Sequence, residues 1–419
     1  MKILIRGGRV IDPASGRDEI GDVFISDGRI SSAKEKAERT IDAKGLVVAP
    51  GLIDLSARLR EPGYEYKATL ESEMDAAVAG GVTSLACPPD TDPPLDEPGL
   101  VDMLRRRAKV LARARVYPIG ALTVKLAGER LTEMAELAEA GCVAFSQANA
   151  PLADTQVLWR AMQYAGTFGF PVWLRAEDRW LAHGGVAHDG EVATRLGLPG
   201  IPSFAETIAL GTVLQLVRAT GTRVHFCRLS TATGVEMIRA AKKEGLPVSC
   251  DVGINHVHLS EMDLGYYDAH CRLEPPLRSQ RDRDALAAGL ADGTIDCAVS
   301  DHTPVDEDQK QMPFAEAEPG ATGLELLLPL ALKWGAERKL PLPKTLARVT
   351  CDPARILGVQ SGRIDVGARA DLVVFDPGQH WRVVPEALKS QGKNTPFLGY
   401  ELAGRVRATI VAGSVVYEA

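Results

Sequence analysis

Charged and polar side chains follow several short apolar runs in the middle of the chain. Ser56 and Arg58 follow the run LIDL and share one face if that run is a strand, because side chains in a strand alternate. Arg175, Arg228 and Asp301 end three later runs in the same way. A carboxylate can accept a proton or bind a metal ion, whereas a guanidinium offers only donors and a fixed positive charge. If three arginines lie near Asp301, we expect them to form ion pairs with carboxylates and to repel a cation.

The elements that position these side chains are eight apolar, strand-like runs between residues 50 and 358, which alternate with helical segments rich in Ala, Leu, Glu and Arg. This alternation predicts repeated βα units and a closed (β/α)8 barrel. Functional groups of such barrels lie at the carboxyl ends of the strands, which is where the charged side chains stand. The runs cover residues 52–59, 82–89, 114–122, 142–147, 171–177, 223–230, 247–254 and 296–302.

The two ends of the chain have a different texture. Residues 1–49 and 359–419 contain short β-branched runs broken by Gly and Asp turns, which is typical of antiparallel strands. We expect them to form one composite β domain beside a barrel domain of residues 50–358.

Composition excludes several classes of function. The 419 residues carry a net charge of -7 without a long basic run, which argues against nucleic-acid binding. No apolar run reaches the roughly 18 residues that a membrane span needs, and the first residues read as a strand rather than a signal peptide, so we expect a cytoplasmic protein. The seven cysteines lack a C-x-x-C pair and are expected to be buried free thiols.

Residues 54–63 carry a specific resemblance. They read Asp-x-Ser-x-Arg-Leu-Arg-Glu-Pro-Gly, similar to the first-strand motif of the dihydroorotases in the amidohydrolase superfamily, Asp-x-His-x-His-Leu-Arg-Glu-Pro-Gly. That motif supplies two zinc-binding histidines and a substrate-binding arginine. Further segments resemble the family in order, among them CPPDTDPPLDEP (87–98), GLPGIPSFAET (197–207), SDHTPVDEDQK (300–310) and GRIDVGARADLVVFDP (362–377). The resemblance implies an amidohydrolase barrel with a small β domain.

The same resemblance places the family's metal ligands on residues that mostly cannot bind a metal. A carboxylated lysine, used by one branch of the family, has only Lys125 as a poor counterpart, and Val305 stands where a further histidine is expected. Only Asp301, the family's ligand and general base, is retained, so we expect no metal or other cofactor, although active relatives use zinc. The former metal positions are Ser56, Arg58, Gln147, Arg175, Arg228 and Asp301, and the former substrate positions are Arg60, Asp90 and Glu274.

Two interpretations of the arginines are open. Each guanidinium could pair with a nearby carboxylate, since a buried charge needs a partner; the candidates are Asp90, Glu177, Asp178, Glu274 and Asp301. Alternatively, Arg58, Arg60 and Arg175 could hold a carboxylate or phosphate ligand, which Asp90 and Glu274 would oppose.

A relocated metal site is a third possibility. It would use His225, His256, His258 or His302. His225 lies three residues before Arg228, and strand alternation places the two on opposite faces.

The resemblance implies a non-catalytic dihydroorotase-like protein that serves as a structural partner of aspartate transcarbamoylase, the preceding enzyme of pyrimidine synthesis, in a homo- or hetero-oligomer. The alternative is an active dihydroorotase or related cyclic-amide hydrolase with a non-standard or absent metal site. In that case Asp301 would be the base, with His302 beside it as an acid/base partner.

Overall fold

Eight parallel strands form the barrel in a computed structural model that describes residues 2–32 and 36–419. Each of the eight apolar runs contains one of them. The strands are β6 (Leu52–Asp54), β7 (Val82–Cys87), β8 (Arg115–Ala121), β9 (Ala144–Ser146), β10 (Val172–Leu174), β13 (Val224–Phe226), β14 (Val248–Gly253) and β15 (Cys297–Val299).

The ring of strands closes just beyond the ends of β6 and β15. There Ala57 and His302 form a parallel bridge, the backbone N–H of Arg58 donates to the His302 carbonyl at 2.9 Å, and that of His302 donates to the Ser56 carbonyl at 3.1 Å. The segments that carry Ser56, Arg58 and Asp301 are thereby held side by side at the barrel mouth.

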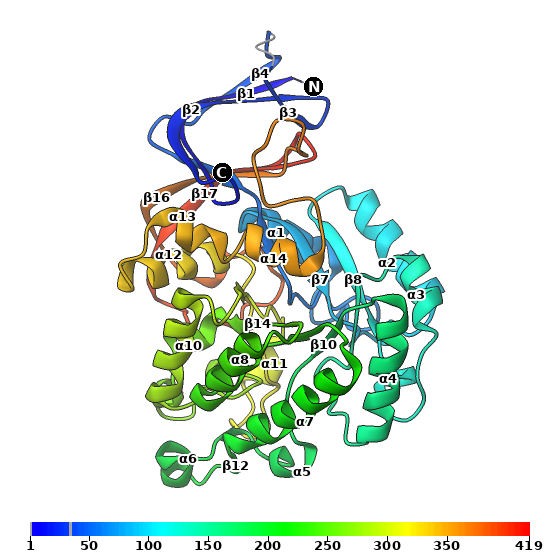
Figure 1. Ribbon diagram of the computed structural model, residues 1–419. Helices are drawn as coiled ribbons and strands as arrows, with labels where there is room; N and C mark the ends of the chain where they lie inside the picture. The colour runs from blue at the N-terminus through cyan, green and yellow to red at the C-terminus, as the bar shows by residue number, and fades with distance from the viewer. Residues whose placement is uncertain (1, 33–35) are drawn as a thin grey trace.

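Helices surround the barrel (Figure 1). Their ends carry ordinary capping residues: the Asp154 side chain accepts from two backbone N–H groups at the start of α4, and Gly169 takes a left-handed φ of 72° at its end. The helices are α1 (Leu70–Ala79), α2 (Pro98–Leu111), α3 (Met134–Ala140), α4 (Thr155–Phe168), α5 (Arg179–Ala182), α6 (Glu191–Leu196), α7 (Phe204–Thr220), α8 (Ala232–Glu244), α9 (Ile254–His258), α10 (Gln280–Asp292), α11 (Glu307–Lys310), α12 (Leu327–Glu337), α13 (Leu342–Ala347) and α14 (Cys351–Leu357). A small parallel pair, β11 (Ala187–His188) and β12 (Gly200–Ile201), lies between α5 and α7.

Both ends of the chain contribute to a second sheet, which lies at one end of the barrel with both termini (Figure 1). Its strands are β1 (Ile3–Asp12), β2 (Arg17–Ser26), β3 (Arg29–Ser31), β4 (Arg39–Asp42), β5 (Val47–Pro50), β16 (Leu372–Arg382), β17 (Glu401–Val411) and β18 (Ser414–Glu418). Strand β5 joins the two ends, because it pairs with β1 on one side and with β16 on the other. The fold predicted from the sequence is confirmed.

The second sheet and the barrel share apolar contacts. One face of the sheet has its own core, which includes Ile5, Val10 and Val374, whereas Phe375 and Val406 belong to the large core of the barrel and its helices. Segment 383–400 leaves the sheet between β16 and β17, and its Asn394 side chain bonds to Thr303 and Val305 near the barrel mouth.

The barrel axis is filled with side chains. Ile53, Leu55, Ile119, Trp173 and Val299 form a separate buried cluster inside the ring of strands. The seven cysteines are free thiols, five of them buried and two half-buried, as expected. Within the described ranges no helix has the length and apolar character needed to cross a membrane.

Candidate functional site

Asp301 lies at the centre of the barrel mouth and binds two arginines. One carboxylate oxygen accepts from Arg228 Nη1 at 3.0 Å, from Ser56 Oγ at 3.2 Å and from Arg58 Nη1 at 3.4 Å. Arg58 continues outward, where its Nε donates to Asp90 at 2.7 Å and its Nη1 to Thr303 Oγ1 at 3.1 Å. The positions of Ser56, Arg58, Arg228 and Asp301 thus converge, with three donors on one oxygen of the aspartate.

Arg175 lies in the same mouth but binds other carboxylates. Its guanidinium donates to both oxygens of Glu177 at 2.6 and 2.9 Å and to Glu274 at 2.8 Å. Asn149, in the loop after β9, connects this group to the first. Its carbonyl accepts from Arg175, its side-chain oxygen from Arg228, and its amide donates to Glu274 at 3.2 Å.

The ion pairs control the charge of the former substrate positions. Burial alone would raise the pKa of Asp90. The charge and hydrogen bond of Arg58, together with the charges of Arg60 and Arg228, outweigh burial and hold that pKa below its ordinary value. Burial likewise opposes ionisation of Glu274, and Arg175, followed by Arg228, lowers its pKa. Four carboxylates and three arginines therefore stand in the mouth as a compensated charge network rather than as a free positive cluster.

The paired interpretation of the arginines accounts for four of the five candidate carboxylates. Asp178 is the exception, because it accepts from the backbone N–H groups of Trp180 and Leu181 as the N-cap of α5. The expectation for Asp178 was therefore wrong: a short polar side chain directly before a helix satisfies the helix terminus.

Two predicted site residues turn away from Asp301. Arg60 donates to the Pro304 carbonyl at 2.8 Å and lies 3.4 Å from Glu318. Gln147 uses its amide group on Thr123 and on the Leu126 carbonyl. The three arginines of the alternative anion pocket donate to different protein acceptors, which are Asp90 and Asp301 for Arg58, the Pro304 carbonyl for Arg60, and Glu177 and Glu274 for Arg175. Lys125 is exposed, and Val305 is buried.

His302 is not a partner of Asp301. Its Nε2 lies 2.6 Å from a carboxylate oxygen of Glu73, and its Nδ1 accepts from the backbone N–H of Gly323 at 3.0 Å. The imidazole is fully buried beneath the mouth. The expected acid/base pair is wrong because these contacts hold the imidazole beneath the mouth, whereas the Asp301 carboxylate faces Arg58 and Arg228.

The four histidines considered for a relocated metal site are held apart by separate contacts. His256 bonds to the Pro275 carbonyl, His258 to the Leu330 carbonyl, and His302 to Glu73. His225 packs against Trp173 inside the barrel, and Arg228 reaches Asp301 in the mouth of the same barrel. The opposite-face expectation fails because Arg228 has a φ of 57°, which ends the strand alternation.

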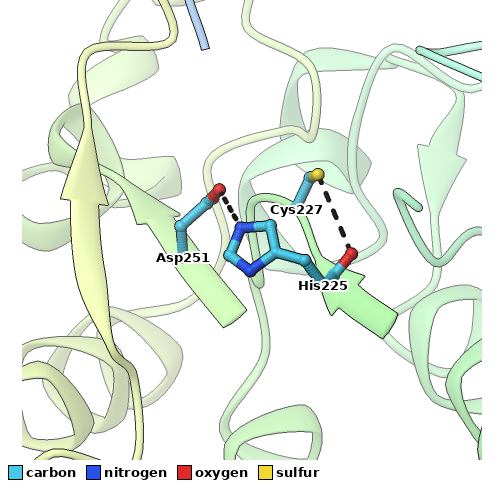
Figure 2. A group of neighbouring side chains, drawn as sticks. All are labelled: His225, Cys227 and Asp251. Atoms are coloured by element: carbon cyan, nitrogen blue, oxygen red, sulfur yellow. Dashed lines mark hydrogen bonds and ion pairs between the residues drawn. The ribbon is translucent and has the colours of Figure 1, made fainter. Parts of the chain in front are cut away.

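One group of potential metal ligands does form around His225, together with Cys227 and Asp251 (Figure 2). Both ring nitrogens of His225 are already engaged, one by Asp251 and the other by Ser249 Oγ, each at 2.8 Å. Burial and the nearby Asp251 charge raise the pKa of the Cys227 thiol well above its ordinary value, so the thiolate needed for a metal is disfavoured. This group is better described as a hydrogen-bonded core histidine.

The donor set at the former metal positions does not fit zinc. Zinc takes imidazole nitrogen, thiolate or carboxylate ligands, and three of the six positions present guanidinium N–H donors. The hydroxyl of Ser56 donates to Asp301, and Asp301 itself accepts from two arginines. No set of lone pairs converges on one point in the mouth as described.

The space left in the mouth is small. A cavity of about 20 Å³ lies beside Ser56, Arg58 and Arg228, and one of about 100 Å³ is lined by Gln147, Arg175 and Glu177 together with residues of α4 and α7. Pockets for small molecules span on the order of 300–1,000 Å³. Larger hollows, of about 450 and 300 Å³, lie on the outside of the barrel. The first is lined by the loop before α1 and by α2, and the second by α9, α10 and α12. Neither contains a predicted site residue other than His258.

Sequence reasoning missed Asn149 and Trp173. Asn149 links Arg175, Arg228 and Glu274, and Trp173 lies under the mouth. The only signal in the sequence was position, since Asn149 follows the carboxyl end of β9 and Trp173 lies within the short strand β10.

Comparison with known proteins gives the family. A family model described as dihydro-orotase-like matches residues 45–233, and one described as amidohydrolase family matches residues 203–417. A dihydroorotase-like protein from Pseudomonas aeruginosa is 46% identical over 423 residues, with all of both chains covered. A protein named dihydroorotase from Geobacter sp. (strain M21) is 42% identical over 424 residues, again with both chains covered completely.

Among solved structures, L-hydantoinase from Arthrobacter aurescens superimposes with a TM-score of 0.88 at 25% identity, covering 99% of this chain and 96% of its own. Full-length similarity in sequence and in structure leads to one conclusion: the chain belongs to the amidohydrolase family, in its dihydroorotase-like group.

Proposed function

We propose that this chain is a non-catalytic dihydroorotase-like protein whose barrel serves as a structural partner of aspartate transcarbamoylase. The observation that supports the absence of catalysis is the pairing of three arginines with carboxylates. Arg58, Arg175 and Arg228 stand at former ligand positions, and each is locked to a carboxylate at 3.0 Å or less.

Amide hydrolysis at neutral pH needs an activated water. A metal ion lowers the pKa of water from about 15.7 to about 7, whereas a carboxylate base alone contributes roughly 10²- to 10⁴-fold. Asp301 cannot take the base role easily, because its charge is already shared by two guanidiniums.

The partnership rests on the resemblance and on what the fold retains. A structural subunit needs a packed core and intact outer helices, but it does not need an open mouth. The barrel core and its helices are complete in this chain, while the mouth is filled by ion pairs. We expect a barrel to keep its core and outer helices, but not an open mouth, when a partner binds its surface and the barrel catalyses no reaction.

The first experiment measures zinc by elemental analysis, together with turnover of dihydroorotate and carbamoyl-aspartate, on protein purified without chelators. We expect less than about a tenth of an equivalent of zinc and no turnover. One or two tightly bound metal ions with turnover would contradict the proposal. A matched variant restores the family residues through Ser56→His, Arg58→His, Gln147→Asp, Arg175→His and Arg228→His. If these substitutions alone silenced the site, the variant should bind zinc, because imidazoles replace the cations that repel a metal. A variant that stays metal-poor would show that the surroundings, including Asp90 and Glu274, differ as well.

The second experiment tests the partner. The chain is mixed with the aspartate transcarbamoylase catalytic chain of the same organism and run on a sizing column with light scattering, with each protein alone as the control. We expect a single species heavier than either component. Two separate peaks at micromolar concentration would refute the partnership without affecting the metal result.

A second candidate function is an active cyclic-amide hydrolase. It is favoured by one finding, the 42% identity over full length to a protein named dihydroorotase. It requires metal or water activation by groups other than those now paired in the mouth, and the turnover assay separates it from the proposal.

A further inference from the structure

The cavity of about 20 Å³ under the barrel mouth has an unusual lining. Ten residues surround it, and the only charged ones among them are Arg58 and Arg228. None of the lining side chains is a carboxylate. Asp301 pairs with both arginines, but it is not part of the lining. The cavity therefore faces two cationic side chains and no anionic one.

Two buried N–H groups of the lining have no acceptor within the described part of the chain. They are Nε of Arg228, whose side chain is 4% exposed, and Nε1 of Trp173, a residue that is 3% exposed. The other two nitrogens of Arg228 donate hydrogen bonds to Asp301, Asn149 and the Glu274 carbonyl. The Nε–H group is therefore not part of the ion-pair network.

A hydroxyl adds a third donor. Ser146 also lines the cavity, and its oxygen accepts from the backbone N–H of Ala148 at 3.0 Å. Among the described residues nothing accepts from this hydroxyl, so its hydrogen is available. Buried donors are costly without an acceptor, and nearly all of them find one in folded proteins.

We propose that this cavity binds one monoatomic anion, chloride or bromide, held by the N–H groups of Arg228 and Trp173 and the hydroxyl of Ser146. A halide accepts hydrogen bonds from every side, which matches a lining whose unpaired polar groups are donors. A water molecule would have to place two hydrogens of its own among the same donors. Sulfate, phosphate and carboxylates are too large, because the cavity has room for roughly one water-sized group.

The proposed site differs in kind from a zinc site. It uses Arg228, a former ligand position, as a donor to an anion, and it adds Trp173 and Ser146 from strands β10 and β9. Its ligand is bound by hydrogen bonds and positive charge and needs no deprotonated histidine.

Two measurements on the wild-type protein test the site. Crystals grown in bromide should show an anomalous peak within hydrogen-bond distance of Trp173 Nε1 and Arg228 Nε. Thermal unfolding in sodium chloride or bromide is compared with sodium gluconate at equal ionic strength. The midpoint should rise by about 1–2 °C for each tenfold increase in halide above the dissociation constant, given the length of the chain.

A matched pair of variants assigns the effect to the cavity. Trp173→Phe removes one donor and should reduce the halide-dependent shift by at least half. Trp334→Phe makes the same change at another buried tryptophan, whose Nε1 donates to the Ala287 carbonyl, and should keep the full shift.

Three outcomes would overturn the proposal. They are a bromide crystal with only water in the cavity, equal unfolding midpoints in halide and gluconate, and a Trp173→Phe variant that keeps the whole shift. If Trp173→Phe does not fold, the two wild-type measurements still decide the question.

Discussion

Replacing Asp301 tests whether this aspartate stabilises the fold or takes part in a reaction. Asp301 is 8% exposed and accepts from Arg228, Arg58 and Ser56. Asp301→Asn keeps the size of the side chain but removes the charge that both guanidiniums face. Removing one partner of a buried ion pair costs about 3–5 kcal/mol, since the other charge stays buried.

The magnitude for this protein lies near the lower limit. Arg58 keeps Asp90 at 2.7 Å, and Arg228 keeps Asn149 and the Glu274 carbonyl. We expect a loss of about 3 kcal/mol in the free energy of unfolding, which for a chain of 419 residues corresponds to a midpoint lower by about 3 °C.

Differential scanning calorimetry is the assay, with Asp308→Asn as the control because Asp308 is an exposed aspartate in the same segment. Asp301→Asn combined with Arg228→Met should lose less stability than the sum of the single changes, by roughly 1–2 kcal/mol. The reasoning is refuted if Asp301→Asn unfolds at the wild-type temperature, since functional residues are often replaced without loss of stability.

Two other predictions concern titrating groups outside the mouth. Burial raises the pKa of Glu325 to about 7, so the protonated carboxyl favours folding, and this contribution is lost as the pH rises from about 4.5, the ordinary pKa of a glutamate, toward 7. The unfolding midpoint of Glu325→Gln should therefore rise relative to wild type over this pH range. A difference in midpoint that does not change with pH would count against the raised pKa. Burial raises the pKa of Cys87, Cys142 and Cys271 to about 12, so mass spectrometry after iodoacetamide at pH 8 should find fewer than about one alkylated thiol in the native protein and seven in denaturant; rapid labelling of the native protein would show that these cysteines are accessible.

The fold could be predicted from the sequence because its signals are local. Each barrel strand is a short apolar run, and each of the eight runs contains one strand. The Gly and Asp turns at the two ends of the chain likewise indicated antiparallel strands. Pairing of β5 with β16, more than 300 residues apart, follows once both ends are recognised as strands of one domain.

The partners within the mouth could be predicted only in part. Residue type required each arginine to find a carboxylate, but Arg175 and Glu274 are 99 residues apart, and nothing local indicates this pairing. Side-chain directions failed for a physical reason. Arg60, Arg228 and Asp301 have left-handed φ values of 62°, 57° and 49°, and each ends the two-residue alternation on which directions in a strand depend.

Of these left-handed residues, Arg228 and Asp301 place charge at positions that the resemblance assigns to metal ligands. A metal ion in a barrel mouth joins loops from several strands, because its ligands come from different strand ends. Here guanidinium groups make similar connections: Arg58 joins β6 to the loops after β7 and β15, and Arg175 joins the loop after β10 to residue 274 after β14.

The retention of Asp301 is then explained without chemistry. Three buried cations need compensating charge, and an aspartate between Arg58 and Arg228 supplies it to two of them at once. A surviving ligand is therefore weak evidence for a surviving reaction. The stronger evidence lies in its partners, because the carboxylate oxygen that accepts from Arg58, Arg228 and Ser56 is already part of the charge network.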